Sequence, residues 1–357
     1  MSSFIILIEE YGFGHAVAAI EKGFLVDFFI DPLDPEKQFL VGSVETAKLD
    51  RAQKGINGTF VTLPNQKKGF LKNTKKLAKH SVIPVYIDLV VEPHKAQPVN
   101  DKIILKGRFI ILTLNKPGIN ISRQIKSEVE RARLFAILPK LKHSLPENCG
   151  LIFRSQAVNA EDQDLIEEIT EKIYKSRLIL DDDLSEPRVI IEPKKARERA
   201  LQEWQFADTF SLVEEASCFD RYGVWEQVSM FLENRVSLDN GGFLMIETTS
   251  ALIAVDINTG TDVSYAGALK TNLLAMRELP RQLEIRGLGG KIVVEFAPLS
   301  KKDRAKIETE LNKALEKYNS KSMVVGWTKL GNLEIQKKRS KLPIIEALKT
   351  DGRFDIV

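Results

Sequence analysis

The segment 241–295 constrains the fold more than any other part of the 357-residue chain. It contains two short apolar runs rich in β-forming residues, and between them residues 268–286 carry apolar side chains close to a helical period. A strand, a helix and a second strand in this order predict two parallel strands whose carboxyl ends share one edge of a sheet. We therefore expect Asp256 and Glu295, which end the two strands, to lie side by side.

Asp256 and Glu295, together with the amide oxygen of Asn258, match the ligand preference of Mg²⁺. This ion takes oxygen ligands, binds few protein groups and keeps several waters. Two acids at strand ends are also common as plain solvated side chains. The pattern alone leaves both interpretations open.

The same segment resembles the catalytic segment of the ribonuclease E/G family, endoribonucleases that cut single-stranded RNA with magnesium. The shared features follow in order: paired glycines, the strand ending in Asp256-Ile257-Asn258, Thr271-Asn272-Leu273, Arg281-Gln282-Leu283 and Leu288-Gly289-Gly290. The resemblance implies that Asp256, Asn258 and Glu295 are catalytic. It also implies that Asp256 and Glu295 hold Mg²⁺, with Mn²⁺ as a possible substitute. The family has an aspartate where this chain has Glu295, whose extra methylene displaces the carboxylate by about one bond length.

Composition indicates a globular protein of a reducing compartment. The chain is 43% hydrophobic and 28% charged, and no apolar run reaches the roughly 18 residues of a membrane span. The first apolar run, residues 4–8, is followed at once by Glu9 and Glu10, which argues against a signal peptide. Cys149 and Cys218 stand far apart without metal-ligand spacing, so we expect a cytoplasmic protein.

Residues 38–104 contain several short β-type segments separated by Gly, Asn and Pro, which predict a small barrel of the OB-fold type. Within it, residues 51–79 include eight Lys or Arg and no Asp or Glu, a pattern of either a solvated face or a nucleic-acid surface. The family resemblance implies that Phe60, Phe70 and Lys95 bind RNA. Aromatic rings on which bases stack, beside a cationic groove, are typical of single-strand binders.

A later β-type segment ends at Arg154 and Ser155. Arginine presents a planar fork suited to phosphate, and the hydroxyl adds a donor, although an ordinary surface ion pair would use the same arginine. The resemblance implies a pocket that senses an RNA 5′-monophosphate, formed by Gly107, Ile111, Arg154 and Ser155. Serine replaces the threonine of the family and keeps the hydroxyl.

The resemblance implies an α/β and α+β multidomain fold. A ribonuclease-H-like subdomain with the 5′-sensor region would comprise residues 1–37 and about 105–240, with a hairpin at Glu21-Lys22-Gly23. The OB-fold barrel 38–104 would be inserted into it, and residues 241–357 would form a DNase-I-like catalytic α/β subdomain. We assign no chemistry to the helices expected at 160–177 and 192–206 or to the acidic turn 181–183.

We therefore expect a hydrolase, an endoribonuclease in RNA processing or decay, including rRNA processing, that prefers 5′-monophosphorylated single-stranded RNA. One alternative is a non-catalytic RNA-binding protein derived from the same family, and another is a structural partner protein. The basic run 337–339 either contacts RNA phosphates or faces solvent. The chain lacks the Cys-x-x-Cys zinc link of larger members, so we expect a short form without a zinc-bridged dimer, while a homodimer through another surface stays open.

Overall fold

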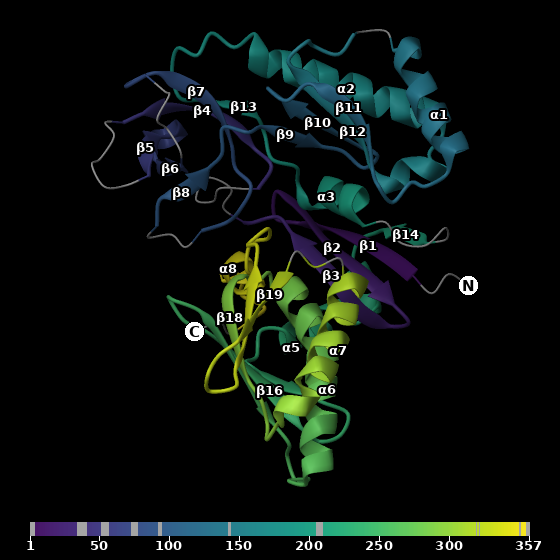
Figure 1. The fold of residues 1–357 in the computed structure, drawn as a ribbon, viewed down its shortest axis with the longest axis vertical. Coiled ribbons are helices and arrows are strands. Elements are labelled where there is room, and N and C mark those ends of the chain that lie inside the picture. The colour runs from purple at the N-terminus through teal and green to yellow at the C-terminus, as the bar shows by residue number, and fades with distance from the viewer. Residues whose placement is uncertain are drawn as a thin grey trace. The chain divides into compact units, whose positions relative to one another are not determined.

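The computed structural model describes residues 4–33, 41–50, 57–72, 78–91, 95–141, 144–204, 210–318, 320, 322–349 and 351–354. Their contacts divide the chain, drawn in Figure 1, into two compact units. The first unit comprises Met1–Gln38, Lys195–Arg197 and Phe206–Val357, and the second comprises Phe39–Lys194 and Glu198–Gln205. Across the described ranges, no helix combines the length and the apolar character that a membrane crossing requires. The mixture of helices with several separate sheets agrees with the expected mixed α and β fold class.

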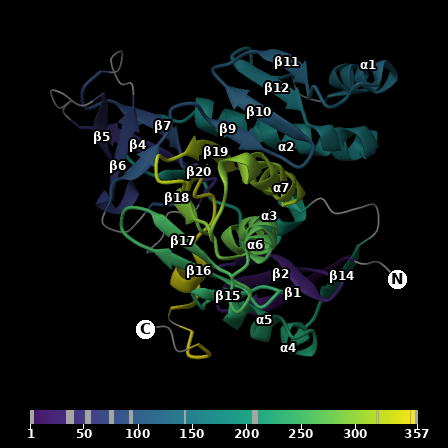
Figure 2. The same ribbon diagram turned by 60° about the horizontal axis from the view of Figure 1, so that its bottom comes forward.

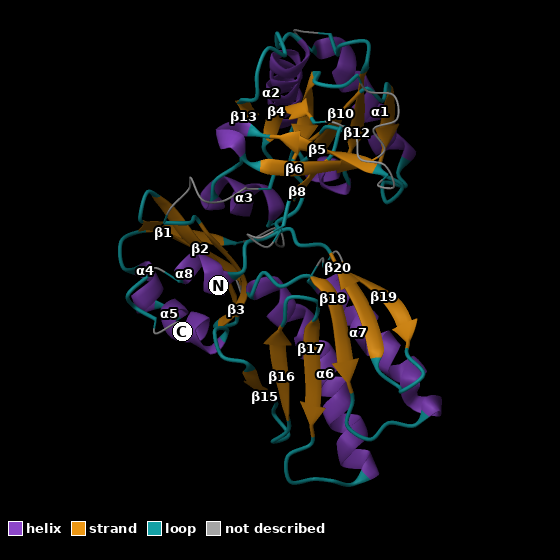
Figure 3. Ribbon diagram, turned by 90° about the vertical axis from the view of Figure 1, so that its left-hand side faces the viewer, coloured by secondary structure: helices purple, strands orange, loops and turns teal. Residues whose placement is uncertain are grey.

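The first unit contains a six-stranded sheet in the order β15-β16-β17-β18-β20-β19. Its strands are β15 (Arg235–Ser237), β16 (Phe243–Thr248), β17 (Ile253–Asn258), β18 (Gly290–Glu295), β20 (Leu333–Lys337) and β19 (Ser322–Trp327). Helices α6 (Tyr265–Ile285) and α7 (Arg304–Lys317) lie along one side of this sheet (Figure 3). The predicted strand-helix-strand arrangement is confirmed, because β17 and β18 are parallel neighbours joined through α6.

Apolar side chains on α6 explain which face of the sheet is covered. Ala275, Met276, Leu279 and Leu283 are buried against the apolar residues of β17 and β18. Ser264 precedes the helix as its N-cap, and its side chain accepts a hydrogen bond from the Gly267 amide. Because side chains alternate along a strand, this packing leaves every second residue of β17 and β18 on the opposite face of the sheet.

A four-stranded sheet in the order β14-β1-β2-β3 completes the first unit. Its strands are β14 (Ser211–Glu214), β1 (Phe4–Tyr11), β2 (Gly14–Glu21) and β3 (Phe24–Ile30). The antiparallel pairing of β2 with β3 confirms the predicted hairpin. Helices α4 (Cys218–Arg221), α5 (Val224–Met230) and α8 (Ile344–Leu348) contribute to the core beneath it, and Figure 2 shows α4 and α5 near β1 and β2.

The basic run at 337–339, which we expected to lie on the surface, includes one buried lysine. Lys337 is only 2% exposed, and its ammonium lies 3.4 Å from the Glu284 carboxylate of α6. Burial lowers the pKa of Lys337 from its ordinary value, and the Glu284 charge opposes that shift. The Arg339 guanidinium donates to the Gly289 carbonyl at 2.8 Å. The expectation was wrong for Lys337, because alternation along β20 turns this residue toward the core.

The second unit contains a six-stranded sheet in which β13-β4-β5-β6-β8 are neighbours and β7 also pairs with β4. Its strands are β13 (Val189–Ile191), β4 (Val44–Leu49), β5 (Gly58–Thr62), β6 (Lys68–Lys72), β8 (Gln97–Val99) and β7 (Val82–Tyr86). A short 3-10 turn, η2 (Pro64–Gln66), connects β5 with β6. Strand β13 comes from far along the chain, and nothing in the local sequence pattern predicted that it joins these strands.

A four-stranded sheet in the order β11-β12-β10-β9 forms the rest of the second unit. Its strands are β11 (Gly118–Ile121), β12 (Cys149–Phe153), β10 (Ile110–Leu114) and β9 (Ile104–Lys106), and its helices are α1 (Glu128–Ile137), α2 (Asp162–Leu180) and most of α3 (Ala196–Glu203). Figure 1 shows α2 running across this sheet, where Leu165, Ile169 and Ile173 are buried against β10 and β12. Three 3-10 turns, η3 (Leu138–Lys140), η4 (Ser155–Asn159) and, in the first unit, η5 (Lys301–Asp303), complete the elements.

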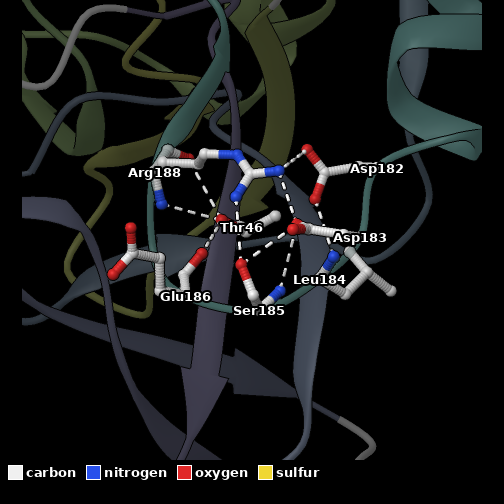
Figure 4. Close-up of polar contacts among 7 residues, drawn as sticks. All are labelled: Thr46, Asp182, Asp183, Leu184, Ser185, Glu186 and Arg188. Atoms are coloured by element: carbon white, nitrogen blue, oxygen red, sulfur yellow. Dashed lines mark hydrogen bonds and ion pairs between the residues drawn. The ribbon is translucent and has the colours of Figure 1, made fainter.

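The acidic turn after α2 has a structural role (Figure 4). The Arg188 guanidinium contacts Asp182 at 2.9 Å and Asp183 at 2.6 Å, which lowers the pKa of the Asp183 carboxyl. The buried Thr46 hydroxyl of β4 donates to the Glu186 carbonyl and accepts from the Arg188 amide, each at 2.7 Å. These contacts attach the chain before β13 to β4, and they pair Asp182 and Asp183 with Arg188.

Glu45 of β4 should make the stability of the second unit depend on pH. The residue is 7% exposed, and its burial raises its pKa to about 7 from the ordinary 4.5. Between these values the folded protein holds a proton that the unfolded chain releases, so stability falls as pH rises through this window. We expect Glu45→Gln to remove this dependence and to stabilise the unit by up to about 3 kcal/mol near pH 8. The free energy of unfolding in urea is measured for the wild type and the variant at about pH 5 and about pH 8. An unchanged pH dependence in the variant would show that Glu45 is not its source.

Candidate functional site

The two predicted metal ligands are direct neighbours. Asp256 of β17 and Glu295 of β18 are partners in the parallel register, and both side chains are exposed. Val255 and Val294, the preceding residues, are buried against the helices, so both carboxylates lie on the opposite, open face of the sheet. The Asn258 amide nitrogen donates to Asp256 Oδ2 at 2.8 Å and holds that carboxylate in place. The structure therefore brings all three predicted catalytic residues together.

This donor set fits a hard divalent cation. Adjacent parallel strands lie about 4.8 Å apart, which lets two carboxylates converge on one ion while waters fill the remaining positions. Among the described residues there is no group of three or more His, Cys, Asp or Glu side chains that could hold a metal. The buried Cys149 and Cys218 belong to different units. The carboxylate pair and the Asn258 amide oxygen offer the few oxygen ligands that a magnesium ion would take from protein.

Two residues beside this pair were not identified from the sequence. Phe243 of β16 is the register partner of Asn258, and the Arg235 guanidinium of β15 lies 3.8 Å from the centre of the Phe243 ring. The register also pairs Met245 with Asp256. Only the pairing of β15, β16 and β17 brings Arg235 and Phe243 to the open face, and no sequence motif marks them. They place an aromatic ring beside Asn258 and a cation against that ring, on the face that carries the carboxylates.

The predicted RNA-binding phenylalanines form a pair on the sheet of the second unit. Phe60 of β5 and Phe70 of β6 are register partners, with ring centres 5.4 Å apart in an edge-to-face arrangement. Both are half-buried, whereas Val61 and Leu71 on the other face belong to the core. A side chain at Gly58 would come within 2.6 Å of the Phe70 ring, so this glycine makes room for it.

Lysines accompany the phenylalanine pair. Lys68 and Lys72 alternate with buried residues on β6 and are exposed, and Lys68 forms an ion pair with Asp50 at 3.0 Å. Lys95 is exposed and precedes β8, whose Pro98 is the register partner of Phe70. Arg51, Lys54, Lys75 and Lys76 of the basic run lie outside the described residues. The described part of this surface thus combines aromatic rings with several cations.

The predicted phosphate-sensing residues meet at the turn between β9 and β10. The Arg154 guanidinium donates to the Gly107 carbonyl at 2.5 Å and to the Arg108 carbonyl at 3.1 Å. Ser155 follows directly, and Ile111 on β10 pairs with Ile152 on β12. Burial lowers the pKa of the Arg154 guanidinium, which the charges of nearby carboxylates oppose. Arg154 therefore contacts the turn at residues 107–110 directly, while Ile111 and Ser155 follow the turn and Arg154 in the sequence.

Sequence reasoning missed a carboxylate at the same turn. Glu168 of α2 accepts hydrogen bonds from the Phe109 amide at 3.1 and 3.2 Å and from the Ile110 amide at 3.2 Å. It is also one of the charges that act on Arg154, and Glu203 of α3 is the other. Arg108 in the turn is exposed. A glutamate in an acidic helix gives no signal in the sequence that it reaches a distant turn.

Comparison with known proteins gives consistent matches. A model of the Ribonuclease E/G family matches residues 104–213 and 201–340. Ribonuclease E of Nostoc sp. is 27% identical over 361 residues, covering 86% of this chain and 52% of that protein. Ribonuclease G of Haemophilus influenzae is 26% identical over 385 residues, covering 91% of this chain and 77% of that protein. Ribonuclease G of Escherichia coli is 24% identical over 391 residues, covering 93% and 79%.

These matches differ in how much of each relative they include. The chain spans about half the length of the ribonuclease E relative and about three quarters of the two ribonuclease G relatives. The stretch matched by the family model contains the carboxylate pair, the turn 107–110 and Arg154. It begins after Phe60, Phe70 and Lys95, which lie in the part that the full-length relatives also match.

Proposed function

Because the chain belongs to the ribonuclease E/G family, we propose that it is a magnesium-dependent endoribonuclease. Its substrate in this proposal is single-stranded RNA, with a preference for 5′-monophosphorylated molecules, in cytoplasmic RNA processing or decay that includes rRNA processing. The observation that carries the proposal is the register pairing of Asp256 with Glu295 on the open face of the sheet. Within the described residues, neither of these exposed carboxylates has a structural partner that would explain its position, apart from the Asn258 amide that donates to Asp256.

The roles of the three residues follow from their positions. Asp256 and Glu295 would hold the cation, and Asn258 keeps the Asp256 carboxylate oriented through its 2.8 Å hydrogen bond. A bound magnesium ion supplies a water of lowered pKa and a positive charge beside the scissile phosphate. Phe243 is the register partner of Asn258, and the Arg235 guanidinium lies 3.8 Å from the centre of its ring, so Arg235 offers a cation for RNA phosphates on this face. The chain's own residues thus supply orientation, metal binding and substrate contacts.

The second unit would supply the other RNA-binding surfaces of this proposal. In this proposal its six-stranded sheet is an OB-fold barrel, on which Phe60 and Phe70 stack bases and Lys95 contacts the backbone. Gly107, Ile111, Arg154 and Ser155 would receive the 5′-monophosphate. The finer subdivision into a ribonuclease-H-like part, residues 1–37 and about 105–240, and a DNase-I-like part, residues 241–357, belongs to the same proposal. A homodimer without a zinc bridge is compatible with it.

A cleavage assay with defined RNA tests the proposal. Purified protein is incubated with a 5′-monophosphorylated, 3′-fluorescein-labelled single-stranded oligoribonucleotide, and the products are resolved on a denaturing gel. Internal cleavage should require magnesium and stop with EDTA. The same RNA hybridised to its complement should resist. Cleavage that continues in EDTA, or none under any divalent ion, would contradict a metal-dependent nuclease.

One observation favours a second candidate function, a non-catalytic RNA-binding protein. Glu295 stands where the family resemblance places an aspartate, so the site could retain RNA surfaces without the geometry for cleavage. This candidate predicts salt-sensitive RNA binding without cleavage in magnesium or manganese. A purely structural partner protein would bind no RNA, so a binding titration at two salt concentrations separates it from the other two candidates. The cleavage assay then separates the nuclease from the RNA-binding protein.

The phenylalanine pair should carry a large part of the RNA affinity. We expect Phe60→Ala and Phe70→Ala each to weaken binding of a single-stranded oligoribonucleotide by about 1–3 kcal/mol, because a base loses its stacking partner. Fluorescence anisotropy measures the affinity, and thermal unfolding by circular dichroism checks the fold. Phe24→Ala is the matched control, since Phe24 is 66% exposed on β3 in the other unit. Unchanged affinity in both folded variants would remove the stacking role.

A further inference from the structure

The turn 107–110 already holds a negatively charged group of the protein itself. Both oxygens of Glu168 accept from the Phe109 amide, and one also accepts from the Ile110 amide, all at 3.1–3.2 Å. A side chain at Gly107 would come within 1.5 Å of Glu168 Oε1, so the carboxylate rests directly on the glycine backbone. Successive backbone amides that converge on one anion form a typical site for carboxylate or phosphate.

The helix explains why Glu168 reaches this turn. Leu165 and Ile169, on either side of it, are buried between α2 and the sheet that contains β10. Glu168 lies on the border of this apolar stripe and is half-buried, whereas its neighbour Glu167 is exposed and accepts from Gln163 at 2.8 Å. The packing of α2 therefore places Glu168 at the turn, and its carboxylate occupies the turn amides unless another anion takes its place.

Arg154 approaches the same turn from its carbonyl side. It donates to Gly107 and Arg108, and the Glu168 and Glu203 charges both act on it. A phosphate that reaches this arginine would therefore meet two carboxylates, one of which already occupies the turn amides. Two unit charges about 4 Å apart repel by roughly 1–4 kcal/mol at effective dielectric constants between those of water and a protein surface.

We infer that Glu168 is a specificity-determining residue, an internal competitor that imitates the RNA 5′-phosphate at the turn 107–110 and limits the preference for monophosphorylated ends. The inference rests on the proposed 5′-phosphate sensing and adds the residue that sets its strength. The RNA 5′-phosphate can accept hydrogen bonds from the turn amides only when it displaces the Glu168 carboxylate. Removing the charge at 168 therefore strengthens the discrimination between 5′-monophosphate and 5′-hydroxyl ends.

The test compares two oligoribonucleotides of one sequence, one with a 5′-monophosphate and one with a 5′-hydroxyl, both labelled with fluorescein at the 3′ end. Affinities are measured by anisotropy in EDTA, which prevents cleavage, for the wild type, Glu168→Gln and Glu167→Gln. Glutamine keeps a carbonyl acceptor for the turn amides and removes the charge. Glu167→Gln removes an equal charge from the adjacent, exposed position of the same helix.

We expect Glu168→Gln to raise the ratio of the two affinities about tenfold, while Glu167→Gln leaves the ratio at the wild-type value. Adding Arg154→Leu to Glu168→Gln should return the ratio to near one, because the phosphate then loses its charged donor. Glu168→Asp keeps the charge but withdraws it from the amides, and it should give an intermediate ratio. If Glu168→Gln does not fold, the affinity ratio of Glu168→Asp still tests whether Glu168 competes with the phosphate.

An unchanged or lower ratio in folded Glu168→Gln would overturn the inference and leave Glu168 as a brace for the turn. A ratio near one in every protein would overturn it as well, because the turn would then bind no phosphate even without its competitor. Cleavage of the 5′-hydroxyl RNA by the wild type in magnesium is measured separately. The nuclease proposal can therefore stand when the inference fails, and the affinity ratio can be read when cleavage fails.

Discussion

Asp256→Asn should reduce magnesium-dependent RNA cleavage by about a thousandfold or more while RNA affinity changes by only a few-fold. The amide has no negative charge with which to bind a divalent cation. Its oxygen can still accept the hydrogen bond that Asn258 donates, at 2.8 Å in the native protein. Because Asp256 is exposed and carries no packing role, the fold should persist.

Single-turnover cleavage and anisotropy in EDTA separate the two effects for Asp256→Asn. The matched control is Glu247→Gln, which removes an exposed acid from the same open face, where Glu247 pairs with Ala254. This control should cleave at the wild-type rate. Full activity in Asp256→Asn would end the metal-site proposal, and equal losses in both variants would point to the general charge of the face.

Glu295→Gln should abolish metal-dependent cleavage to the same extent, because the register makes Glu295 the partner of Asp256. The longer side chain of glutamate displaces the carboxylate, and this matters for a cation that demands near-ideal octahedral geometry. We expect the site to be adapted to glutamate, since the other elements of the family's site are retained. Glu295→Asp should then bring no gain of activity. Manganese, which accepts less regular coordination, should support cleavage at least partly.

The comparison of Glu295→Asp with the wild type decides between the two candidate functions. Glu334→Gln serves as the control, because Glu334 is an exposed acid of β20 on the same face, opposite Val293. We expect the site to be adapted to Glu295. This expectation fails if the native protein is inert with magnesium and manganese while the Glu295→Asp variant cleaves. The natural chain would then be a non-catalytic RNA-binding protein, the second candidate function.

Elements formed by neighbouring segments could be predicted from the sequence. The pairing of Phe60 with Phe70 follows from two strands joined by the η2 turn, and the β2-β3 hairpin follows from its Glu-Lys-Gly turn. The approach of Asp256 to Glu295 spans more residues, but a strand-helix-strand unit has essentially one handed solution. In each case a local pattern also fixed the tertiary contact.

Other contacts join segments whose local patterns contain no information about each other. Strand β14 pairs with β1 across about two hundred residues, and β13 joins β4 across more than a hundred. The same holds for side chains: Glu168 reads as one more acid on a solvated helix, and Lys337 as part of a basic run. Their partners, the turn amides and Glu284, become neighbours only when whole elements pack.

The sequence by itself determined which residues could do chemistry, because strand ends, helical periods and the family's ordered motifs are local properties of the chain. Tertiary structure alone decided which charges face those residues. It placed Phe243 beside Asn258 with Arg235 against its ring, and it set Glu168 on the amides of the turn that the sequence assigned to a phosphate. The physical reason is that a charge acts over a few ångströms in space, and the packing of distant elements fixes which groups lie within that range.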